Sequence, residues 1–214
     1  MIFLPLSILL LVLFVLFLPI LFFFLHLHIA GKALSKLGIS PNTAILIILL
    51  CLIGSMINIP LFSRGIDPID SFKHPFGYIG FPQITDKQVV AINLGGAIIP
   101  ILICLYLLPK APIGKTLIAT IISSFIVYKL AQPIPGVGVT IPIFIPPIVA
   151  ALLALSLSPG NPTPVAYISG VLGVLIGGDL MNLGSFATTG FMSIGGAGVF
   201  DGIFMVGIIS AILG

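Results

Sequence analysis

The sequence is short of charge. It contains no glutamate, and charged residues make up only 6% of its 214 residues, whereas hydrophobic residues make up 59%. Since an average soluble domain carries about 25% charged residues, the composition excludes an ordinary water-soluble protein. The formal net charge of +3 is too small and too dispersed to form a nucleic-acid-binding surface, so we expect no nucleic-acid partner.

Cysteine is also scarce. Cys51 and Cys104 each sit inside an apolar run. They fit no metal-ligand spacing, and a disulfide in the middle of a membrane is unfavourable. We therefore expect two buried thiols, no metal site and no cofactor.

Long apolar runs fill most of the chain. A membrane-crossing helix needs about 20 mostly apolar residues, and seven segments approach this: 3–29, 43–60, 89–108, 116–132, 143–158, 164–183 and 196–213. The segment 143–158 is predicted to be short or re-entrant because it contains Pro146 and Pro147. The sequence thus predicts one all-α domain over 1–214, a polytopic transmembrane helical bundle of about seven spans in the cell membrane, with the lipid bilayer as its partner.

The loops between these segments differ in charge. Those at 31–42 and 109–115 carry lysines and no acids, whereas 61–88 carries cations and acids and is long enough for a small extramembrane cap. Positively charged loops tend to stay in the cytoplasm, so we expect the lysine loops inside and the cap outside. The stretch 132–147, rich in proline and glycine, cannot be regular helix. It is either a surface loop or a broken element lining a cavity.

Two isolated aspartates mark the C-terminal part. Between residue 130 and the C-terminus there is no Lys, Arg, His or Glu, and the carboxylate side chains are Asp179 and Asp201. Intramembrane acids are costly and therefore candidates for a functional site. The alternative is a protonated aspartate that hydrogen-bonds between helices. Glycines, among them Gly178 and Gly202, flank both acids, and small residues let membrane helices approach closely.

Counting membrane crossings places the polar residues together. Four ends of the predicted helices fall on one membrane face. They are the ends near Asn58 and Asn93, the end of 164–183 and the start of 196–213. At about 1.5 Å rise per residue the two aspartates reach comparable depth, and Asn182, three residues after Asp179, shares its helix side. We expect one polar layer at the outer face, formed by Asn58, Asn93, Asp179, Asn182 and Asp201.

Five segments carry a resemblance to a known family. They are "INIPL" (57–61), "NLGGAIIP" (93–100), "PIPGVGVTIPIFIPP" (133–147), "VAYISGVLGVLIGGDLMNL" (165–183) and "IGGAGVFDGIF" (194–204). The chain from about residue 45 onward resembles an archaeal and bacterial membrane family catalogued as domain of unknown function 1614, most specifically in the two Asp-containing motifs. The resemblance implies a polytopic membrane protein and no particular activity.

A fainter resemblance concerns the aspartates alone. "IGGD" (176–179) and "FD" (200–201) are similar to the Gly-x-Gly-Asp and Tyr-Asp motifs of the presenilin and signal-peptide-peptidase type of intramembrane aspartyl protease. The match departs from those motifs, because Ile176 stands where the first glycine belongs and Phe200 replaces tyrosine. The order of the motifs is also reversed and a Pro-Ala-Leu motif is missing.

Two functions follow from these residues. In an aspartyl hydrolase, Asp179 and Asp201 would share a proton and activate water against a membrane-peptide substrate. In a transporter or channel, an oxygen-rich site would bind a small cation or relay protons, with these substrate-binding or ion-binding residues beside the acids: Asn58, Asn93, Asn182, Gly178 and Gly202. A structural, lipid-modifying or accessory role is a third alternative. The matching glycine-rich settings of the two acids favour the hydrolase.

Overall fold

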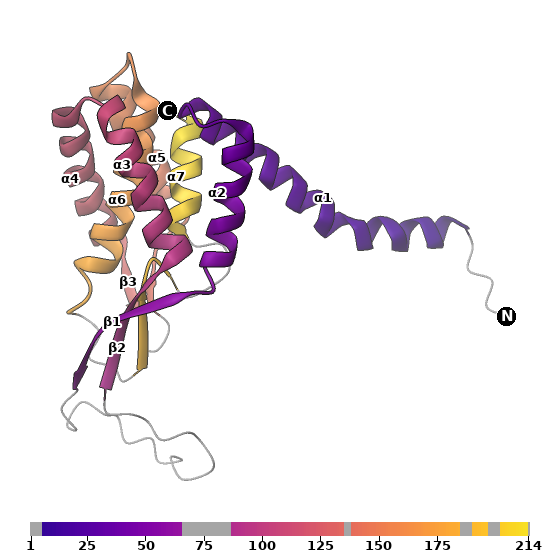
Figure 1. Ribbon diagram of the computed structural model, residues 1–214, viewed down its shortest axis with the longest axis horizontal. Coiled ribbons are helices and arrows are strands. Elements are labelled where there is room, and N and C mark those ends of the chain that lie inside the picture. Colours follow the sequence, from indigo (N-terminus) through magenta and orange to yellow (C-terminus); the bar gives the residue numbers. More distant parts are fainter. Residues whose placement is uncertain (1–5, 66–86, 135–137, 185–189, 197–201, 214) are drawn as a thin grey trace, which may run out of the picture.

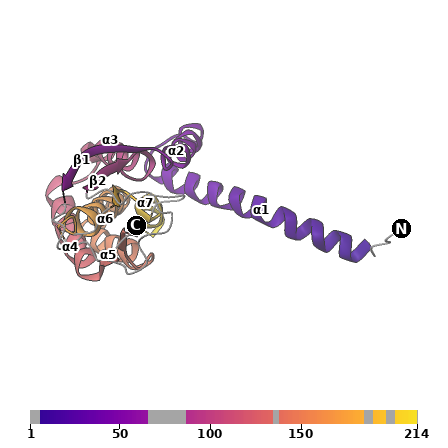
Figure 2. The same cartoon turned by 90° about the horizontal axis from the view of Figure 1, so that it is seen from below.

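A computed structural model describes residues 6–65, 87–134, 138–184, 190–196 and 202–213. Six helices, α2 to α7, stand side by side as a bundle, a small sheet lies at one end of it, and α1 projects away (Figures 1 and 2). We call the end that carries the sheet the sheet end. The opposite end, where Lys36 and Lys110 lie, is the lysine end.

Helix α1 (Leu6–Lys36) is followed after a sharp bend by α2 (Pro41–Gly54). Between the last part of α1, His28–Lys36, and α2 the helix direction bends by 118°. The bend is a Schellman motif: Gly38 has φ of 76°, its N–H donates to Ser35 O, and the N–H of Ile39 donates to Leu34 O. The left-handed backbone conformation costs less free energy for glycine than for any other residue, because glycine has no Cβ. Ser40 then caps α2 by accepting the Thr43 N–H at 3.3 Å, which is the ordinary role of serine at a helix start.

The remaining helices are short. The π-helix η1 (Leu94–Ile98) leads into α3 (Ile99–Leu107) and the 3-10 turn η2 (Leu108–Lys110). They are followed by α4 (Ile113–Leu130), α5 (Ile145–Leu157), α6 (Pro162–Val174) with its π-helical extension η3 (Leu175–Leu180), and α7 (Gly202–Leu213). Proline occupies an early position in α2, α3, α5 and α6, where its missing N–H costs little.

Helix α6 forms the centre of the bundle and packs against α4, α5 and α7. Its span, with η3, is 72% buried, against 33% for the span of α4. Glycines permit this packing, because an added Cβ at Gly170 would meet Ser210 of α7 and one at Gly173 would meet Ser123 of α4. Small residues at these contacts let membrane helices approach closely.

The sheet corrects the all-α prediction. Strand β2 (Lys87–Asn93) pairs antiparallel with β1 (Asn58–Gly65) and parallel with β5 (Gly190–Ile194), in the order β1-β2-β5. Strands β3 (Gln132–Ile134) and β4 (Gly138–Thr140) form a separate hairpin. The prediction that 132–147 is not regular helix is therefore confirmed for 132–134 and 138–144 and wrong for 145–147, because α5 begins at Ile145.

Two predicted helix boundaries were wrong for the same reason. The predicted helix 43–60 stops at Gly54, and its last residues enter β1. The predicted helix 89–108 begins as β2, whose Val89, Val90 and Ile92 favour strands. Short apolar runs of this kind cannot be assigned by periodicity alone. The predicted cap 61–88 contributes the end of β1 and the start of β2, and residues 66–86 lie outside the described part of the chain.

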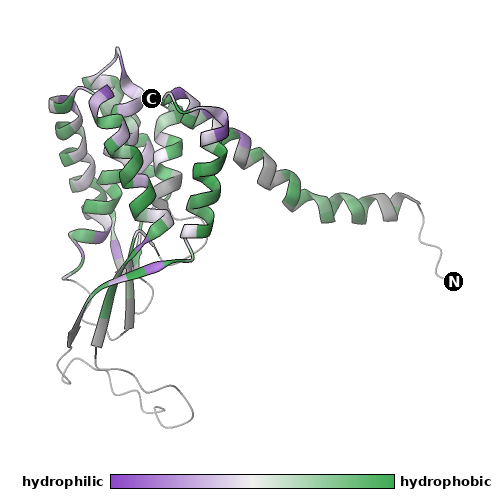
Figure 3. Cartoon of the chain, viewed as in Figure 1, coloured by the Kyte–Doolittle hydropathy of each residue, from purple (hydrophilic) through white to green (hydrophobic). Residues whose placement is uncertain are grey.

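The predicted number of spans is not shown. Each of the seven predicted segments overlaps one α-helix, α1 to α7, although α1 continues seven residues beyond its predicted end, to Lys36. Within the described ranges, however, only Ile113–Leu130 and Pro162–Leu180 are long and apolar enough to cross a membrane, with a third span if the bent pair His28–Lys36 and Pro41–Gly54 counts as one. Leu94–Lys110 and Ile145–Leu157 are apolar but shorter. The helices carry hydrophobic residues along their length and hydrophilic ones near the ends of the bundle (Figure 3). This distribution, with two to three helices that could span a membrane, is the pattern expected of a membrane protein.

Candidate functional site at the sheet end

Asn93 is the hub of the sheet end. Its side chain is 1% exposed and is held by three hydrogen bonds. Nδ2 donates to Ser55 O at 2.8 Å and to Asn58 Oδ1 at 3.0 Å, while Oδ1 accepts the Gly96 N–H at 2.8 Å. The last bond caps η1 at its N-terminus, where helix N–H groups have no partner within the helix. Asn93 thus ties the end of α2, the start of β1 and the start of η1 together.

Asn58 extends this network to β5. It lies directly opposite Asn93 in the β1–β2 register. Its Oδ1 also accepts a hydrogen bond from the Ser193 hydroxyl of β5. Two protein donors therefore converge on one amide oxygen, which satisfies both lone pairs of that oxygen.

Asp179 lies beside the end of β5. Its Oδ2 accepts the Gly195 N–H at 2.8 Å, and Gly195 immediately follows Ile194, the last residue of β5. Gly195 has φ of 87°, and a Cβ there would lie 2.6 Å from Ala97 Cβ and 2.8 Å from Ala97 N. The turn after β5 therefore needs glycine for both its backbone conformation and its contact with η1.

The π-helix η3 carries Asp179 and is anchored on two sides. A Cβ at Gly177 would overlap Ser124 O of α4, and one at Gly178 would lie 2.6 Å from the Ile141 side chain. Asn182 is 4% exposed, and its Nδ2 donates to Gly177 O at 3.0 Å and Gly178 O at 2.9 Å. These bonds satisfy carbonyls that a helix leaves unpaired at its C-terminus. π-Helical turns of this kind occur often at functional sites.

Comparison with known proteins identifies the family. Residues 52–213 match the family described as "Protein of unknown function (DUF1614)". The match covers well over half of the chain. The chain belongs to the DUF1614 family. No curated protein and no solved structure matches it, and the comparisons give no support to the protease resemblance. The match spans every strand and Asp179, whereas α1 and most of α2 precede it.

In this DUF1614 protein, the residues predicted for the site are placed as follows. Asn58 and Asn93 are hydrogen-bonded to each other. Asp179 and Asn182 are neighbours, because the Asn182 N–H donates to the Asp179 carbonyl at 3.2 Å. Gly178 packs on Ile141, and Gly202 is the first residue of α7. Asp201 lies outside the described residues, so the predicted proximity of the two carboxylates stays a prediction.

Sequence reasoning missed two contributors to the sheet end, Ser193 and Gly195. Ser193 gave no signal, since its role depends on the pairing of β5 with β2. Gly195 belongs to the glycine-rich stretch before Asp201, and Gly-Gly at 195–196 is a signal for a turn with positive φ. Among the residues that the structure describes, no group of three or more His, Cys, Asp or Glu side chains could hold a metal ion.

Proposed function

We propose that this DUF1614 protein is an intramembrane aspartyl hydrolase that cleaves membrane peptides, with Asp179 and Asp201 acting as a pair. The observation that carries the proposal is the hydrogen bond from Gly195 N–H to Asp179 Oδ2. It fixes a carboxylate at the end of an edge strand. An extended peptide that docks on this edge would run toward the carboxylate.

The two edges of the sheet differ in their capacity to accept a further strand. The β1 edge contains Pro60, and its register shifts between Pro60 and Phe62. A proline without an N–H and a bulge both hinder strand addition. β5, with the sequence GFMSI, contains neither proline nor charge. In the described part of the chain it pairs only with β2, so its other edge can accept a peptide by strand addition.

Helix packing supports the participation of Asp201. Gly170 of α6 faces Val206 and Ser210 of α7, and Gly207 of α7 faces Tyr167 and Val171 of α6. This close antiparallel pairing brings the C-terminal end of α6, which continues to Asp179, and the N-terminal end of α7 to the same end of the bundle. Asp201 directly precedes Gly202, the first residue of α7.

The proposed reaction needs only these two carboxyl groups and water. The ionised carboxylate takes a proton from a water molecule as the water oxygen attacks the peptide carbonyl carbon. At the same time the protonated partner donates a hydrogen bond to the carbonyl oxygen. Collapse of the tetrahedral intermediate breaks the C–N bond, and the leaving amine takes up a proton. An unwound peptide strand is required, because the backbone bonds of a helix shield its carbonyl groups.

The test is cleavage of a reporter transmembrane peptide in proteoliposomes. Asp179→Asn and Asp201→Asn should each reduce the rate by about 10²- to 10⁴-fold, the usual contribution of an acid–base group. Asp86→Asn, which removes a carboxylate from the charged segment 66–86, is the matched control and should cleave normally. Normal cleavage by either site variant, in protein whose thermal unfolding is unchanged, would eliminate the aspartyl pair.

A second function, proton-coupled transport, is favoured by one observation. Four buried hydroxyls have no hydrogen-bond partner among the described residues: Tyr167, Ser123, Ser124 and Ser210. The Ser210 and Ser123 hydroxyls lie against Gly170 and Gly173 of α6, and the backbone of Ser124 lies against Gly177 of η3, so the series leads toward Asp179. Such a row could pass protons through the bundle.

A cation cage receives less support. Asn58 Oδ1 already accepts two protein donors, and Asn93 Oδ1 accepts the N–H of Gly96. The proteoliposomes used for cleavage also distinguish transport. Uptake of protons reported by an entrapped pH-sensitive dye, lost in Asp179→Asn and present without peptide, would favour the transporter over the hydrolase.

We also propose that α2 to α7 cross the cell membrane together, with the lysine end in the cytoplasm, and that α1 supplies the seventh span. The bundle helices α4 and α5 have 18 and 13 residues, which rise about 27 and 20 Å. Short helices of this kind require local thinning of the roughly 30 Å hydrocarbon core. By number of residues alone, α1 with 31 exceeds the roughly 20 that a spanning helix needs.

Cysteine labelling in intact cells tests this topology. A membrane-impermeant maleimide should label Ser63→Cys at the sheet end and should not label Ser40→Cys at the lysine end. Both positions are exposed, so permeabilised cells should label both. The opposite pattern would reverse the orientation, and equal labelling in intact cells would contradict the proposed crossing.

A further inference from the structure

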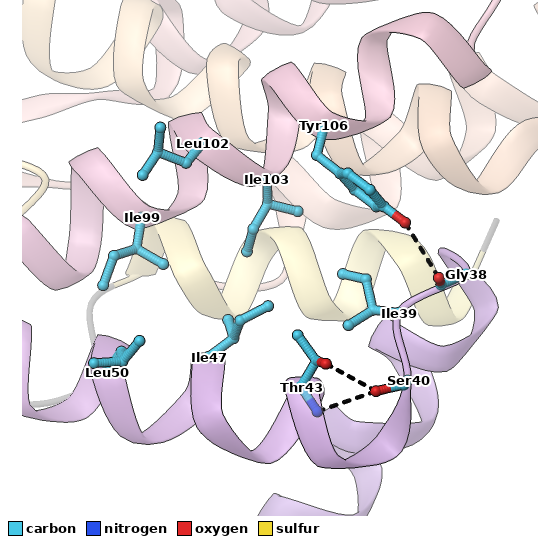
Figure 4. Close-up of a pocket in the computed structure, with 10 residues that line it drawn as sticks. All are labelled: Gly38, Ile39, Ser40, Thr43, Ile47, Leu50, Ile99, Leu102, Ile103 and Tyr106. Atoms are coloured by element: carbon cyan, nitrogen blue, oxygen red, sulfur yellow. Dashed lines mark hydrogen bonds between the residues drawn. The ribbon is translucent and has the colours of Figure 1, made fainter.

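We propose that the groove between α2 and α3 binds one anionic phospholipid of the surrounding bilayer, with an acyl chain along the groove and the phosphate at the lysine end. This site is separate from the sheet end and independent of the proposed hydrolysis. The groove has a volume of about 400 Å³. α2 and α3 form its walls and α7 lies behind them (Figure 4).

The apolar part of the groove suits an acyl chain. Ile47 and Leu50 line it from α2, and Ile99, Leu102 and Ile103 line it from α3. Leu50 and Leu102 are exposed, whereas Ile103 is buried, so the groove opens sideways from a closed floor. The ten helical steps from Ser40 to Leu50 rise about 15 Å, which is half of the hydrocarbon core of about 30 Å and therefore the depth of one leaflet.

Polar groups lie at only one end of this groove. The Tyr106 hydroxyl donates to Gly38 O at 3.3 Å, and Ser40 Oγ and Thr43 Oγ1 are 2.8 Å apart. Lys110 Nζ donates to the Tyr106 hydroxyl at 2.6 Å and lies 3.8 Å from the centre of its ring. The groove thus changes from hydrocarbon to hydroxyl and ammonium groups along its length, as a phospholipid does from its tail to its headgroup.

The charge at this end selects an anionic headgroup. The exposed lysines there are Lys32, Lys36, Lys110 and Lys115. Lys36 Nζ donates to Ile212 O at 2.8 Å, and Lys110 Nζ lies 3.4 Å from Leu37 O, so the partners of both ammonium groups are uncharged. Asp179, whose carboxylate is the sole acidic side chain in the described ranges, lies at the opposite end. Each lysine near a membrane surface contributes about 1 kcal/mol of attraction to anionic lipid.

A protein helix is too large to occupy the groove fully. A helix about 10 Å wide and 15 Å long takes up on the order of 1,200 Å³, several times the volume of about 400 Å³ in the groove. This argues against the long apolar α1 of a second copy as the occupant. The volume lies instead within the range of about 300–1,000 Å³ that small-molecule sites occupy.

Native mass spectrometry of the full chain tests the proposal. The protein is released from nanodiscs that contain equal amounts of phosphatidylglycerol and phosphatidylcholine with matched acyl chains. The wild type should retain one lipid, enriched about fivefold in phosphatidylglycerol. Lys110→Gln should abolish this enrichment, whereas Lys129→Gln, an exposed lysine near the other end of α4, should preserve it. Leu102→Trp should lose the lipid because it fills the groove. Leu117→Trp on α4 is the matched control, since Leu102 and Leu117 are 57% and 59% exposed.

Several results would overturn the site. Absence of a retained lipid, equal retention of the two lipids, or equal effects of the two lysine variants would mean that only non-specific lipid surrounds the helices. A lipid that persists in Leu102→Trp would place it elsewhere. A wild-type dimer that Leu102→Trp dissociates would assign the groove to a second copy. Excess inorganic phosphate should not release the lipid, and release would show that the headgroup alone is bound.

Discussion

Replacing Gly95 with alanine introduces a methyl group where η1 touches α2. The added Cβ would overlap Cys51 O and Ser55 N and would lie 2.8 Å from the carbonyl carbon of Gly54. Ser55 N donates to Cys51 O at 2.8 Å, so the methyl group would fall on an existing hydrogen bond. All these atoms belong to the backbone and cannot turn away as a side chain could. Relief requires α2 and η1 to move apart.

The size of the effect follows from two opposing terms. Overpacking costs about 1–3 kcal/mol, and contact with immobile backbone places Gly95→Ala near the upper value. Alanine in a helix recovers at most about 1 kcal/mol relative to glycine. A net loss of about 2 kcal/mol should lower the melting temperature of a chain of this size by about 4–8 °C.

The protein supplies its own reporter of unfolding. Cys51 and Cys104 are 5% and 4% exposed, so a thiol-reactive fluorophore should label them only as the bundle opens. Gly114→Ala is the matched control, because nothing lies within 4 Å of the added Cβ in this first turn of α4. It should leave the melting temperature unchanged or raise it by a few degrees. If both variants melt together with the wild type, the close contact between α2 and η1 does not exist as described.

Two further substitutions test the polar groups inside the bundle with the same assay. Asn93→Ala removes three hydrogen bonds and leaves Ser55 O and Gly96 N–H buried without this partner. It should lower the melting temperature more than Asn161→Ala, whose one bond to Lys110 O is exposed, by a margin of about 2 kcal/mol; equal shifts would contradict the role of Asn93 as the hub. Tyr167→Phe should keep or raise the melting temperature, since the fully buried hydroxyl has no partner in the described part of the chain and its removal relieves a desolvation cost of about 1 kcal/mol. A clear fall would reveal a partner for that hydroxyl.

The predictions from sequence succeeded where a local signal was sufficient. Apolar runs located seven helices, because apolar composition over 9 to 31 residues is a local property. Proline and glycine correctly excluded regular helix at Gln132–Ile134 and Gly138–Thr140. Counting membrane crossings also predicted that Asn58 and Asn93 lie close together, and the structure joins them by a hydrogen bond.

The failures have a common physical cause. Whether "KQVVAIN" forms a helix or a strand depends on a partner, and β5 lies about a hundred residues further along the chain. The apolar residues before Asn58 favour a helix. They do not show that α2 ends at Gly54 and that Asn58 pairs with Asn93 in a strand. Ser193 enters the sheet end through the same long-range pairing. Span number depends on helix length in the folded bundle, which the apolar runs overestimate because strands and turns use some of their residues.

The parallel pairing of Gln88–Ile92 with Gly190–Ile194 sets an order for biogenesis. The ribosome has synthesised α3, α4, α5 and α6 before it reaches the strand that completes the sheet. β1 and β2 can therefore pair before β5 exists. The backbone groups of β2 that later bond to β5 have no strand partner until β5 is synthesised. Contacts so distant in sequence form slowly. Truncated nascent chains that end before Gly190 would consequently contain α1 to α6 without a complete three-stranded sheet.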